Sequence, residues 1–508
     1  MLRAFATVSG FIFLSRIFGF IRDILIARFL GSSAEAEAFF VAFRLPNLFR
    51  RIFAEGAFNA AFVPIFSKKL SRDSQQSAIQ FAEEAFSVLL ISLIVMTVIA
   101  QLFMPVLVLL IASGFAYDAD KMNLAVLYSR ITFPYLLLMS LTALMSGVLN
   151  AFNKFAITSA APVLLNIVLI SFMLVAHYAE WSFGYTLSWA VLTSGILQFF
   201  IVYRALNSDG LKIRLIKPRM SNNVKNLIRL GGPGLIASGV MQINLLISMQ
   251  IASQFEGGIA WMYYADRLYQ LPVGLIGAAI SVVLLPRLSS LIGQNDNKAL
   301  AASVRDATRW MLFLAIPSAV GLCLIADMIV RTLFFGNEFG EQDVRNTAQI
   351  LQIFALGVPA YVLSKIMSPL YFAHEDMKHP MFFSLATMVI NVVVSIASIR
   401  VLGVLSVPFG NVISVWCNVI LLWGGLFFIQ KQYAFAMLSK RIVAIIGASA
   451  AMGVVLAILK KKLPDDYPQI LVLLGIIGVG FLSYAFCAWM LGAFGRKDIK
   501  ALLQRKKR

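Results

Sequence analysis

The chain contains many apolar runs of about 20 residues or more, separated mostly by short polar segments. A helix of about 20 apolar residues spans the hydrocarbon core of a bilayer, which is about 30 Å thick. Only 13% of the 508 residues are charged, 60% are hydrophobic, and the mean hydropathy is +0.84. A soluble globular chain carries about 25% charged residues. The sequence therefore predicts an all-α polytopic membrane protein with no separate soluble domain.

The apolar runs predict about 14 transmembrane helices. Their approximate ranges are 5–30, 36–66, 80–111, 122–150, 157–177, 184–204, 224–252, 258–286, 306–334, 346–372, 380–400, 406–430, 441–460 and 467–492. The first run is too long for the apolar core of a signal peptide and contains Arg16 and Arg22, so we interpret it as a retained helix. Cys323, Cys417 and Cys487 lie far apart in apolar runs, which favours small core residues over a disulfide framework.

The net charge of +19 follows a topological pattern. Lysine and arginine concentrate in alternate loops, such as 67–72, 204–229 and 287–305, and in the tail that ends "RKKR". The positive-inside rule then places the basic loops and both termini in the cytoplasm. The three lysines at 460–462 are an exception, because they fall on the predicted outer side. Topology explains most of the charge, so we expect contact with anionic membrane lipids and no nucleic-acid binding.

The two halves of the sequence resemble each other weakly. At a nearly constant spacing, Arg44 matches Arg267, Pro134 matches Pro359 and Asn166 matches Asn391. This pattern predicts two parallel six-helix repeats around a central cavity, related by an axis along the membrane normal. We assign the N-terminal repeat to 1–220, the C-terminal repeat to 221–432, and two additional helices with a basic cytoplasmic tail to 433–508. Two such repeats can rock and open the cavity alternately to either side.

The first predicted helix carries Arg16, Arg22 and Asp23 near its middle. A charge at the bilayer centre costs about 2.5–3.5 kcal/mol on insertion scales, so such residues usually face a bundle interior or a water-filled cavity. Arg16 and Asp23 are seven residues apart and share one helical stripe, whereas Arg22 lies to one side of it. Snorkelling to the headgroups is the alternative, and we prefer it only for Arg28 near the outer end.

The second predicted helix repeats this pattern. Glu37, Arg44, Arg51 and Glu55 share a narrow face, and Arg50 points elsewhere on an ideal helix. Pro46 should kink the helix and make the phase beyond it uncertain. Internal ion pairs between Glu37 and Arg44 and between Arg51 and Glu55 explain the pattern about equally well, but they leave an excess of arginine.

In the second repeat, Asp266 and Arg267 lie in the eighth predicted helix, and the seventh opens on "GGPG" at 231–234. Helices 1, 2, 7 and 8 are equivalent pairs of the repeats, so we expect their polar groups to converge on an arginine-rich central cavity. The guanidinium fork suits phosphate and carboxylate. The cavity therefore predicts an anionic, phosphate-bearing substrate.

Signals for catalysis or metal binding are weak. The two histidines of "HEDMKH" at 374–379 are five residues apart, which puts them on different faces of a helix, and Pro380 follows at once. The sequence has no Walker loop and no convincing Ser–His–Asp constellation. We expect a transporter with no metal and no cofactor rather than an enzyme.

Several motifs resemble the MurJ (MviN) lipid II flippase family, within the multidrug/oligosaccharidyl-lipid/polysaccharide exporter superfamily. They are "SRIFGFIRD" at 15–23, "AFFVAFRLPNLFRRIFAEGAFNAAFVPIF" at 38–66, "ITFPY" at 131–135 and "WMYYADRL" at 261–268. The resemblance covers nearly the whole chain. It implies alternating-access transfer of undecaprenyl-diphosphate-linked disaccharide-pentapeptide, the peptidoglycan precursor, from the inner to the outer leaflet. It also implies a bacterial inner-membrane location, coupling to the membrane potential or a monovalent cation, and contact with cell-wall synthesis proteins.

The same resemblance assigns residues. Substrate-binding positions are Arg16, Arg22, Arg50 and Arg267, with Arg51 and Arg44 as further candidates; charge-balancing or gating positions are Asp23, Glu37, Glu55 and Asp266. Helical phase favours Arg51 where the family pattern favours Arg50. The last two helices resemble those that form a groove for the polyprenyl tail. Alternatives are an exporter of another polyprenyl-linked oligosaccharide, a cation-coupled drug antiporter and a membrane-embedded transferase.

Overall fold

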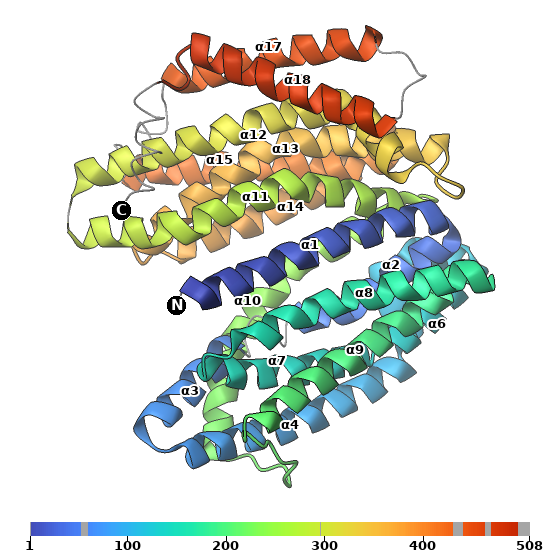
Figure 1. Ribbon diagram of the computed structural model, residues 1–508, viewed down its shortest axis with the longest axis vertical. Coiled ribbons are helices and arrows are strands. Elements are labelled where there is room, and N and C mark those ends of the chain that lie inside the picture. Colours follow the sequence, from blue (N-terminus) through green and yellow to red (C-terminus); the bar gives the residue numbers. More distant parts are fainter. Residues whose placement is uncertain (1, 52–58, 295, 430–439, 463–468, 496–508) are drawn as a thin grey trace. The chain divides into compact units, whose positions relative to one another are not determined.

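The computed structural model describes the chain except for residues 1, 52–58, 295, 430–439, 463–468 and 496–508 (Figure 1). All regular secondary structure in the described residues is helical, which confirms the all-α prediction. Nine stretches of this described part are long and apolar enough to cross a membrane. The protein is therefore a multi-pass membrane protein, and the count of 14 helices stays a prediction.

The helices pack into two compact units. Unit 1 comprises residues 1–260 and 336–340, and unit 2 comprises residues 261–335 and 341–508. This division follows packing, whereas the predicted boundaries near 220 and 432 follow internal duplication. The repeat boundaries therefore stay a prediction.

Unit 1 contains the N-terminal helices. They are α1 (Leu2–Leu30), α2 (Ala34–Arg50), α3 (Asn59–Arg72), α4 (Gln75–Leu102), α5 (Met104–Ile111), η2 (Ser113–Tyr117), α6 (Ala119–Thr132), α7 (Tyr135–Ala151), α8 (Phe155–Ala179), α9 (Phe183–Ser208) and α10 (Asn222–Ala252). Local sequence explains several of the breaks. Ser33 and Asp118 cap α2 and α6 by accepting hydrogen bonds from backbone N–H groups of the first turn. Pro134 separates α6 from α7 within one apolar stretch.

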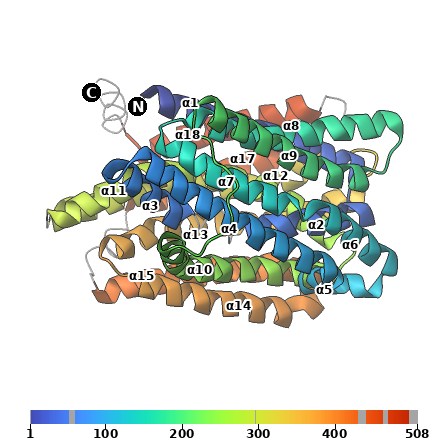
Figure 2. The same cartoon turned by 90° about the horizontal axis from the view of Figure 1, so that it is seen from below.

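Helix α7 lies at the centre of unit 1. It packs against α9, α3 and α4, and Figure 2 shows it beside them. On a second side of the unit, α8 packs against both α9 and α1. Two glycines of α9 allow the close approach of α7 and α6, because a Cβ at Gly195 would lie 2.7 Å from Tyr135 of α7 and one at Gly184 would lie 2.7 Å from Tyr128 of α6.

A later segment of the chain also belongs to unit 1. Residues 336–340 pack on the turn between α1 and α2, where the Glu338 N–H donates to the Arg28 carbonyl oxygen. Gly31 in that turn has a φ of +58°, and a Cβ on it would lie 1.9 Å from the Glu338 carbonyl oxygen. Both its conformation and the close approach therefore require glycine.

Unit 2 contains the remaining helices. They are α11 (Gly258–Gly293), whose first residues still belong to unit 1, α12 (Asn297–Phe334), α13 (Glu341–Ala373), α14 (Lys378–Leu402), η3 (Gly403–Leu405), α15 (Ser406–Ile429), α17 (Lys440–Lys462) and α18 (Gln469–Met490). Helix α13 packs against both α12 and α15, and α14 packs against α15. Their core is mainly aliphatic, and within it the Tyr371 hydroxyl donates to the Leu422 carbonyl oxygen at 2.7 Å.

Helices α17 and α18 pair with each other and pack on α12 (Figure 1). Their contact contains Met452, Leu456, Leu473 and Ile476, and the Tyr484 hydroxyl donates to the carbonyl oxygen of Phe313 in α12 at 2.7 Å. The two C-terminal helices are therefore one layer on a single helix of unit 2, and their role as a groove for a lipid tail stays a prediction.

Asp376 caps the start of α14. It lies in the segment "HEDMKH" at 374–379, which the sequence analysis compares with a metal-binding motif. Its Oδ1 accepts from the backbone N–H groups of Lys378 and His379, and its Oδ2 lies 2.6 Å from His379 Nδ1. Burial raises the pKa of Asp376, but the hydrogen bonds and charge of His379 and the Lys378 N–H outweigh it and lower the pKa below its ordinary value of 3.8.

We expect Asp376→Ala to reduce the free energy of unfolding by about 1 kcal/mol at neutral pH, as loss of a helix cap does. Because the folded-state pKa is depressed, this contribution is present above pH 3.8 and is lost as the pH falls through the lowered pKa. Thermal unfolding of the detergent-solubilised protein at several pH values measures the difference. A difference that persists unchanged at the lowest pH would contradict the role of the ionised carboxylate.

Candidate functional site

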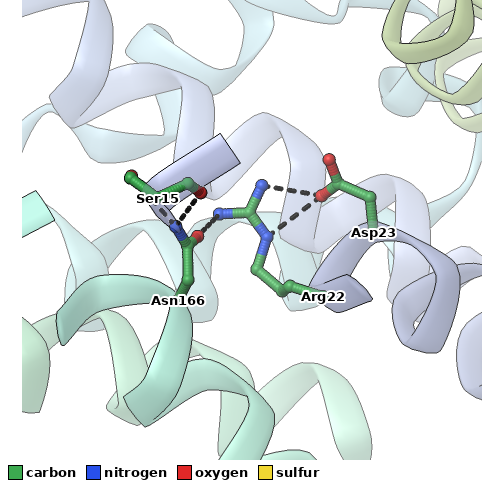
Figure 3. Close-up of polar contacts among 4 residues, drawn as sticks. All are labelled: Ser15, Arg22, Asp23 and Asn166. Atoms are coloured by element: carbon green, nitrogen blue, oxygen red, sulfur yellow. Dashed lines mark hydrogen bonds and ion pairs between the residues drawn. The ribbon is translucent and has the colours of Figure 1, made fainter. Parts of the chain in front are cut away.

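The first site feature is a buried polar cluster between α1 and α8 (Figure 3). The Arg22 Nε and Nη2 atoms both donate to Asp23 Oδ1, at 3.0 and 2.7 Å. The Arg22 Nη1 atom donates to Asn166 Oδ1 at 2.8 Å, and Asn166 Nδ2 donates to the Ser15 carbonyl oxygen at 3.0 Å. Arg22 is 6% exposed and Asp23 is 3% exposed. The guanidinium is therefore held in one orientation by a carboxylate and a carboxamide.

This cluster pairs residues that helical phase alone does not bring together. Sequence analysis places Asp23 on one stripe with Arg16, but the structure pairs it with its neighbour Arg22. Adjacent residues of a helix point in different directions, but the arginine side chain is long enough for its guanidinium to reach the carboxylate of the next residue. Arg16 itself is exposed, and among the described residues it makes no hydrogen bond or ion pair.

A second buried ion pair joins α2 to α6. Lys121 Nζ lies 2.8 Å from Glu37 Oε2, and the Ile259 N–H donates to Glu37 Oε1 at 2.9 Å. Glu37 is fully buried, and Lys121 is 8% exposed. The alternative of an ion pair with Arg44 is wrong, because the two carboxylate oxygens of Glu37 are bound by Lys121 and by the Ile259 N–H instead. Glu37 thus connects three segments of unit 1.

Further hydrogen bonds fix the end of α10 to the loop before α6. The Ser113 N–H donates to Gln250 Oε1, and the Gly114 N–H donates to Ser253 Oγ, both at 3.0 Å. A Cβ on Gly114 would lie 1.9 Å from the Ser253 carbonyl oxygen. The polar residues of the seventh predicted helix therefore include Gln250, which acts in unit 1 as a structural acceptor.

Arg50 lines a partly open cavity of about 340 Å³ in unit 1. The wall consists of side chains from α2, α3, α7, α8 and α9, namely Arg50, Val63, Met139, Thr142, Ala143, Ser146, Gly147, Asn150, Thr158, Ala161, Pro162 and Gln198. Arg50 is half-buried, and its Nε donates to Asn47 Oδ1 at 3.3 Å. Among the described lining residues, Arg50 is the only charged one.

The other predicted residues of unit 1 lie apart from these features. Arg44 is half-buried and Arg51 is exposed at the end of α2. Glu55 lies outside the described residues. Helix α2 continues through Pro46 to Arg50, and Arg50 rather than Arg51 lines the cavity of unit 1. Which of the two faces the predicted central cavity stays a prediction.

In unit 2, the α11 residues Asp266 and Arg267 are half-buried. The Arg267 guanidinium lies 4.7 Å from the ring centre of Tyr263, and Gln270 Nε2 donates to Asp266 Oδ2. A cation over an aromatic face gains about 0.5–2 kcal/mol, which orients the guanidinium. Arg309 of α12 is similarly placed, 4.9 Å from the ring centre of Trp310, and is 7% exposed.

Sequence reasoning missed three of these participants. Lys121 directly follows the acidic loop "YDAD", and no sequence pattern singles it out, although a lysine in the first turn of a helix can reach a neighbouring helix. Arg309 lies in an apolar run and carries the same signal as Arg267. The sequence marks Asn166 only as a repeat match with Asn391, and its role as the Arg22 acceptor depends on the packing of α8 on α1.

Comparison with known proteins identifies the family. The sequence model of the family described as "Lipid II flippase MurJ" matches residues 26–478. A protein of Rhizobium tropici named "Probable lipid II flippase MurJ" is 39% identical over 518 residues, which cover 100% of this chain and 97% of the relative.

Solved structures agree with this match. A structure of "Lipid II flippase MurJ, inward closed conformation" superposes with a TM-score of 0.79 at 26% identity, covering 95% of this chain and 97% of the other. An inward-facing MATE family transporter shares the fold, with a TM-score of 0.68 at 15% identity over 85% of this chain and 95% of the other. From the family description, the relative and the fold together, the chain belongs to the lipid II flippase MurJ family.

Proposed function

We propose that this protein moves lipid II, the undecaprenyl-diphosphate-linked disaccharide-pentapeptide, from the inner to the outer leaflet of the bacterial cytoplasmic membrane. Membership of a lipid II flippase family makes the protein a transporter rather than an enzyme. The lipid is anionic and amphipathic, so its head needs a polar path through the bilayer while its tail stays in lipid. The transported lipid would serve synthesis of the cell wall.

The observation that carries this proposal is the buried, oriented guanidinium of Arg22. Holding it inside the membrane region costs free energy, which the Asp23 carboxylate offsets. Such residues in membrane helices mark substrate or ion paths. Unit 1 also carries Arg16 on α1 and Arg44 and Arg50 on α2, whereas the buried Glu37 is already paired with Lys121. The surplus of guanidinium groups favours an anionic diphosphate.

The mechanism follows from this chemistry. With the site open to the cytoplasm, the headgroup enters between the two predicted repeats, and guanidinium groups of Arg16, Arg22 and Arg267 bind the diphosphate. Guanidinium binds phosphate through two parallel N–H···O bonds, which orients the headgroup. Closure on the cytoplasmic side and opening on the other then exposes the headgroup outside.

Membrane potential supplies a driving force for this cycle. Moving one charge through the full potential is worth roughly 2.3 kcal/mol per 100 mV. With the cell interior negative, the anionic headgroup moves outward downhill, and the empty arginine site returns with part of its charge balanced by acidic residues such as Asp23. Coupling to a monovalent cation is the second way to drive the return. By the positive-inside rule, both termini lie in the cytoplasm. We also expect the protein to contact cell-wall synthesis proteins.

Two other transporters remain as alternatives. An exporter of another polyprenyl-linked oligosaccharide would use the same arginines and differ only in its sugar contacts. A cation-coupled drug antiporter for cationic compounds would need an excess of carboxylates, which is opposite to the charges of the described helices. The first alternative is therefore the closer competitor.

The test removes one guanidinium at a time. In bacteria depleted of their own flippase, Arg22→Ala or Arg267→Ala should lower the lipid II exposed on the outer leaflet at least about tenfold, because each removes a phosphate-binding group whose pairing is worth more than 1.4 kcal/mol. An impermeant enzyme that cleaves only outer-leaflet lipid II measures the exposure.

The matched control is Arg204→Gln, which neutralises an exposed arginine near the end of α9. It should leave the exposed lipid II unchanged, and immunoblots of membrane fractions should show equal amounts of all variants. Normal lipid II exposure in both Arg22→Ala and Arg267→Ala would overturn the proposed function.

A further inference from the structure

The cavity that Arg50 lines has a chemical character of its own. Its described polar lining consists of one guanidinium, three hydroxyls and two carboxamides, from Arg50, Thr142, Ser146, Thr158, Asn150 and Gln198. Its volume of about 340 Å³ is within the range of small-ligand sites. All of these residues belong to unit 1, so the cavity is a feature of one compact unit.

Gln198 carries a buried acceptor that no described residue satisfies. It is 1% exposed, its Nε2 donates to the Ser194 carbonyl oxygen at 3.2 Å, and its Oε1 has no hydrogen-bond partner among the described residues. The orientation of the carboxamide is settled, because a flip would place Oε1 against the Ser194 carbonyl oxygen. A buried acceptor without a partner costs free energy, so the group that fills this cavity should bring an O–H or N–H.

The hydroxyl groups restrict the ligand further. Thr142 donates to the Leu138 carbonyl oxygen at 2.7 Å, and the Thr158 hydroxyl lies 2.9 Å from two acceptors, Asn150 Oδ1 and the Phe155 carbonyl oxygen. Each threonine hydroxyl has used its only hydrogen and can offer the ligand just an acceptor oxygen. Asn150 Oδ1 faces the Thr158 hydroxyl, and no described residue accepts from Asn150 Nδ2, which is left as a donor. The wall therefore needs a ligand with both donors and acceptors.

Arg50 adds a charge requirement. A free cation would be repelled by its guanidinium, and an apolar tail would leave Gln198 without a partner. A bare phosphate would suit Arg50 but would present mainly acceptors to the threonine oxygens. The ligand that fits all of these groups is a hydroxyl- and amide-bearing sugar joined to an anion.

The cavity also lies at a suitable distance from the Arg22 cluster. On α8, Thr158 precedes Asn166 by eight residues, or about 12 Å along the helix. On α2, Phe43, whose ring centre is 6.0 Å from the Arg22 guanidinium, precedes Arg50 by seven residues, or about 10 Å. A headgroup could therefore place its diphosphate near Arg22 and its adjacent sugar in the cavity.

We propose that this cavity between α2, α7, α8 and α9 is a sugar subsite, which binds the acetamido sugar next to the diphosphate. The inference rests on the proposed function and deepens it. Gln198 and Thr158 accept hydrogen bonds from sugar hydroxyl or acetamido N–H groups, Asn150 donates to a sugar oxygen, and Arg50 binds the linked anion. The subsite gives the transporter a means of selecting sugar-bearing lipids over the bare polyprenyl diphosphate.

The experiment compares two lipids on the purified full-length protein in lipid nanodiscs. The probes are lipid II and undecaprenyl diphosphate, which has no sugar, and native mass spectrometry measures both dissociation constants. Gln198→Leu removes the buried acceptor at nearly constant volume, and Ser146→Leu fills the cavity from a half-buried position on α7. The matched control is Ser171→Leu, on an exposed position of α8 that does not line the cavity.

Both cavity variants should weaken lipid II binding about tenfold, the change that 1.4 kcal/mol produces, and leave undecaprenyl diphosphate binding unchanged. Ser171→Leu should change neither dissociation constant. Unchanged lipid II binding in both cavity variants would mean that the cavity holds only water and would overturn the subsite. An equal loss for both lipids would show a general packing defect and would also overturn it.

A third probe distinguishes the source of the sugar. UDP-N-acetylglucosamine carries an acetamido sugar on a soluble diphosphate. We expect it to bind the unaltered protein more weakly than lipid II does. If the cavity variants abolish its binding but leave lipid II binding normal, the cavity serves a free nucleotide sugar and the proposal fails. The proposed function has a separate readout, because it fails when Arg22→Ala and Arg267→Ala still expose lipid II normally.

Discussion

Replacing Lys121 by methionine should lower the free energy of unfolding by about 3–5 kcal/mol, because the substitution leaves the buried Glu37 carboxylate without its cation. The backbone N–H groups of Ile259 and Gly257 cannot compensate for a full charge in a fully buried position. Thermal unfolding of the detergent-solubilised protein, followed by intrinsic fluorescence, should show a transition several degrees lower than that of the unaltered protein.

The double variant Glu37→Gln with Lys121→Met should recover most of this loss, because it removes both charges and keeps an acceptor for Ile259. Lys154→Met is the matched control. Lys154 pairs with Asp209 but is 50% exposed, and such pairs contribute at most about 1 kcal/mol. If Lys121→Met is no more damaging than Lys154→Met, the Glu37 pair is not the stabilising contact described here.

Replacing Asp23 by alanine should be comparably severe and should also stop transport. Asp23 Oδ1 accepts from two nitrogen atoms of Arg22, so its removal leaves a guanidinium that is 6% exposed without its carboxylate. We expect a loss of about 3–5 kcal/mol in the free energy of unfolding. Outer-leaflet lipid II should fall at least about tenfold, because an arginine free to turn no longer meets the diphosphate in one orientation.

A double variant separates the two effects. Arg22→Ala with Asp23→Ala removes the buried pair together, so its unfolding temperature should lie above that of Asp23→Ala. Transport should stay lost, because the phosphate-binding group is absent. Asp23→Asn, which keeps an acceptor oxygen, should lie between the unaltered protein and Asp23→Ala in stability. Recovery of transport in the double variant would show that Arg22 serves packing alone.

The class of fold follows from hydropathy because the bilayer leaves few choices for a chain of long apolar runs. Local breaks are also readable, since Ser33, Asp118 and Pro134 are residues with known effects on helix ends. The number of helices is harder to predict. Helices α1 and α2 are not among the nine apolar stretches of the described chain: the middle of α1 carries Arg16, Arg22 and Asp23, and α2 is only 17 residues long.

The sequence shows which membrane helices carry charged residues, but it does not predict which residues these charges pair with. Helical phase gives only the direction of each Cβ atom. Arg22 has several rotatable side-chain bonds, so its guanidinium can reach Asp23 although the two Cβ atoms point in different directions. Glu37 binds Lys121 from a helix that begins more than eighty residues later, and nothing in the local sequence names that partner. The cavity at Arg50 is harder still, because five helices supply its wall and only their packing reveals the Gln198 oxygen.

The return of residues 336–340 to unit 1 has a consequence for biosynthesis. Unit 1 lacks the segment that covers its α1–α2 turn until the ribosome has translated past residue 340. At about 5–20 residues per second, the stretch after residue 260 takes on the order of 4–16 s to synthesise. During that interval the Arg28 carbonyl oxygen lacks its hydrogen bond from Glu338. Unit 1 therefore completes its folding only after residues 336–340 have been synthesised.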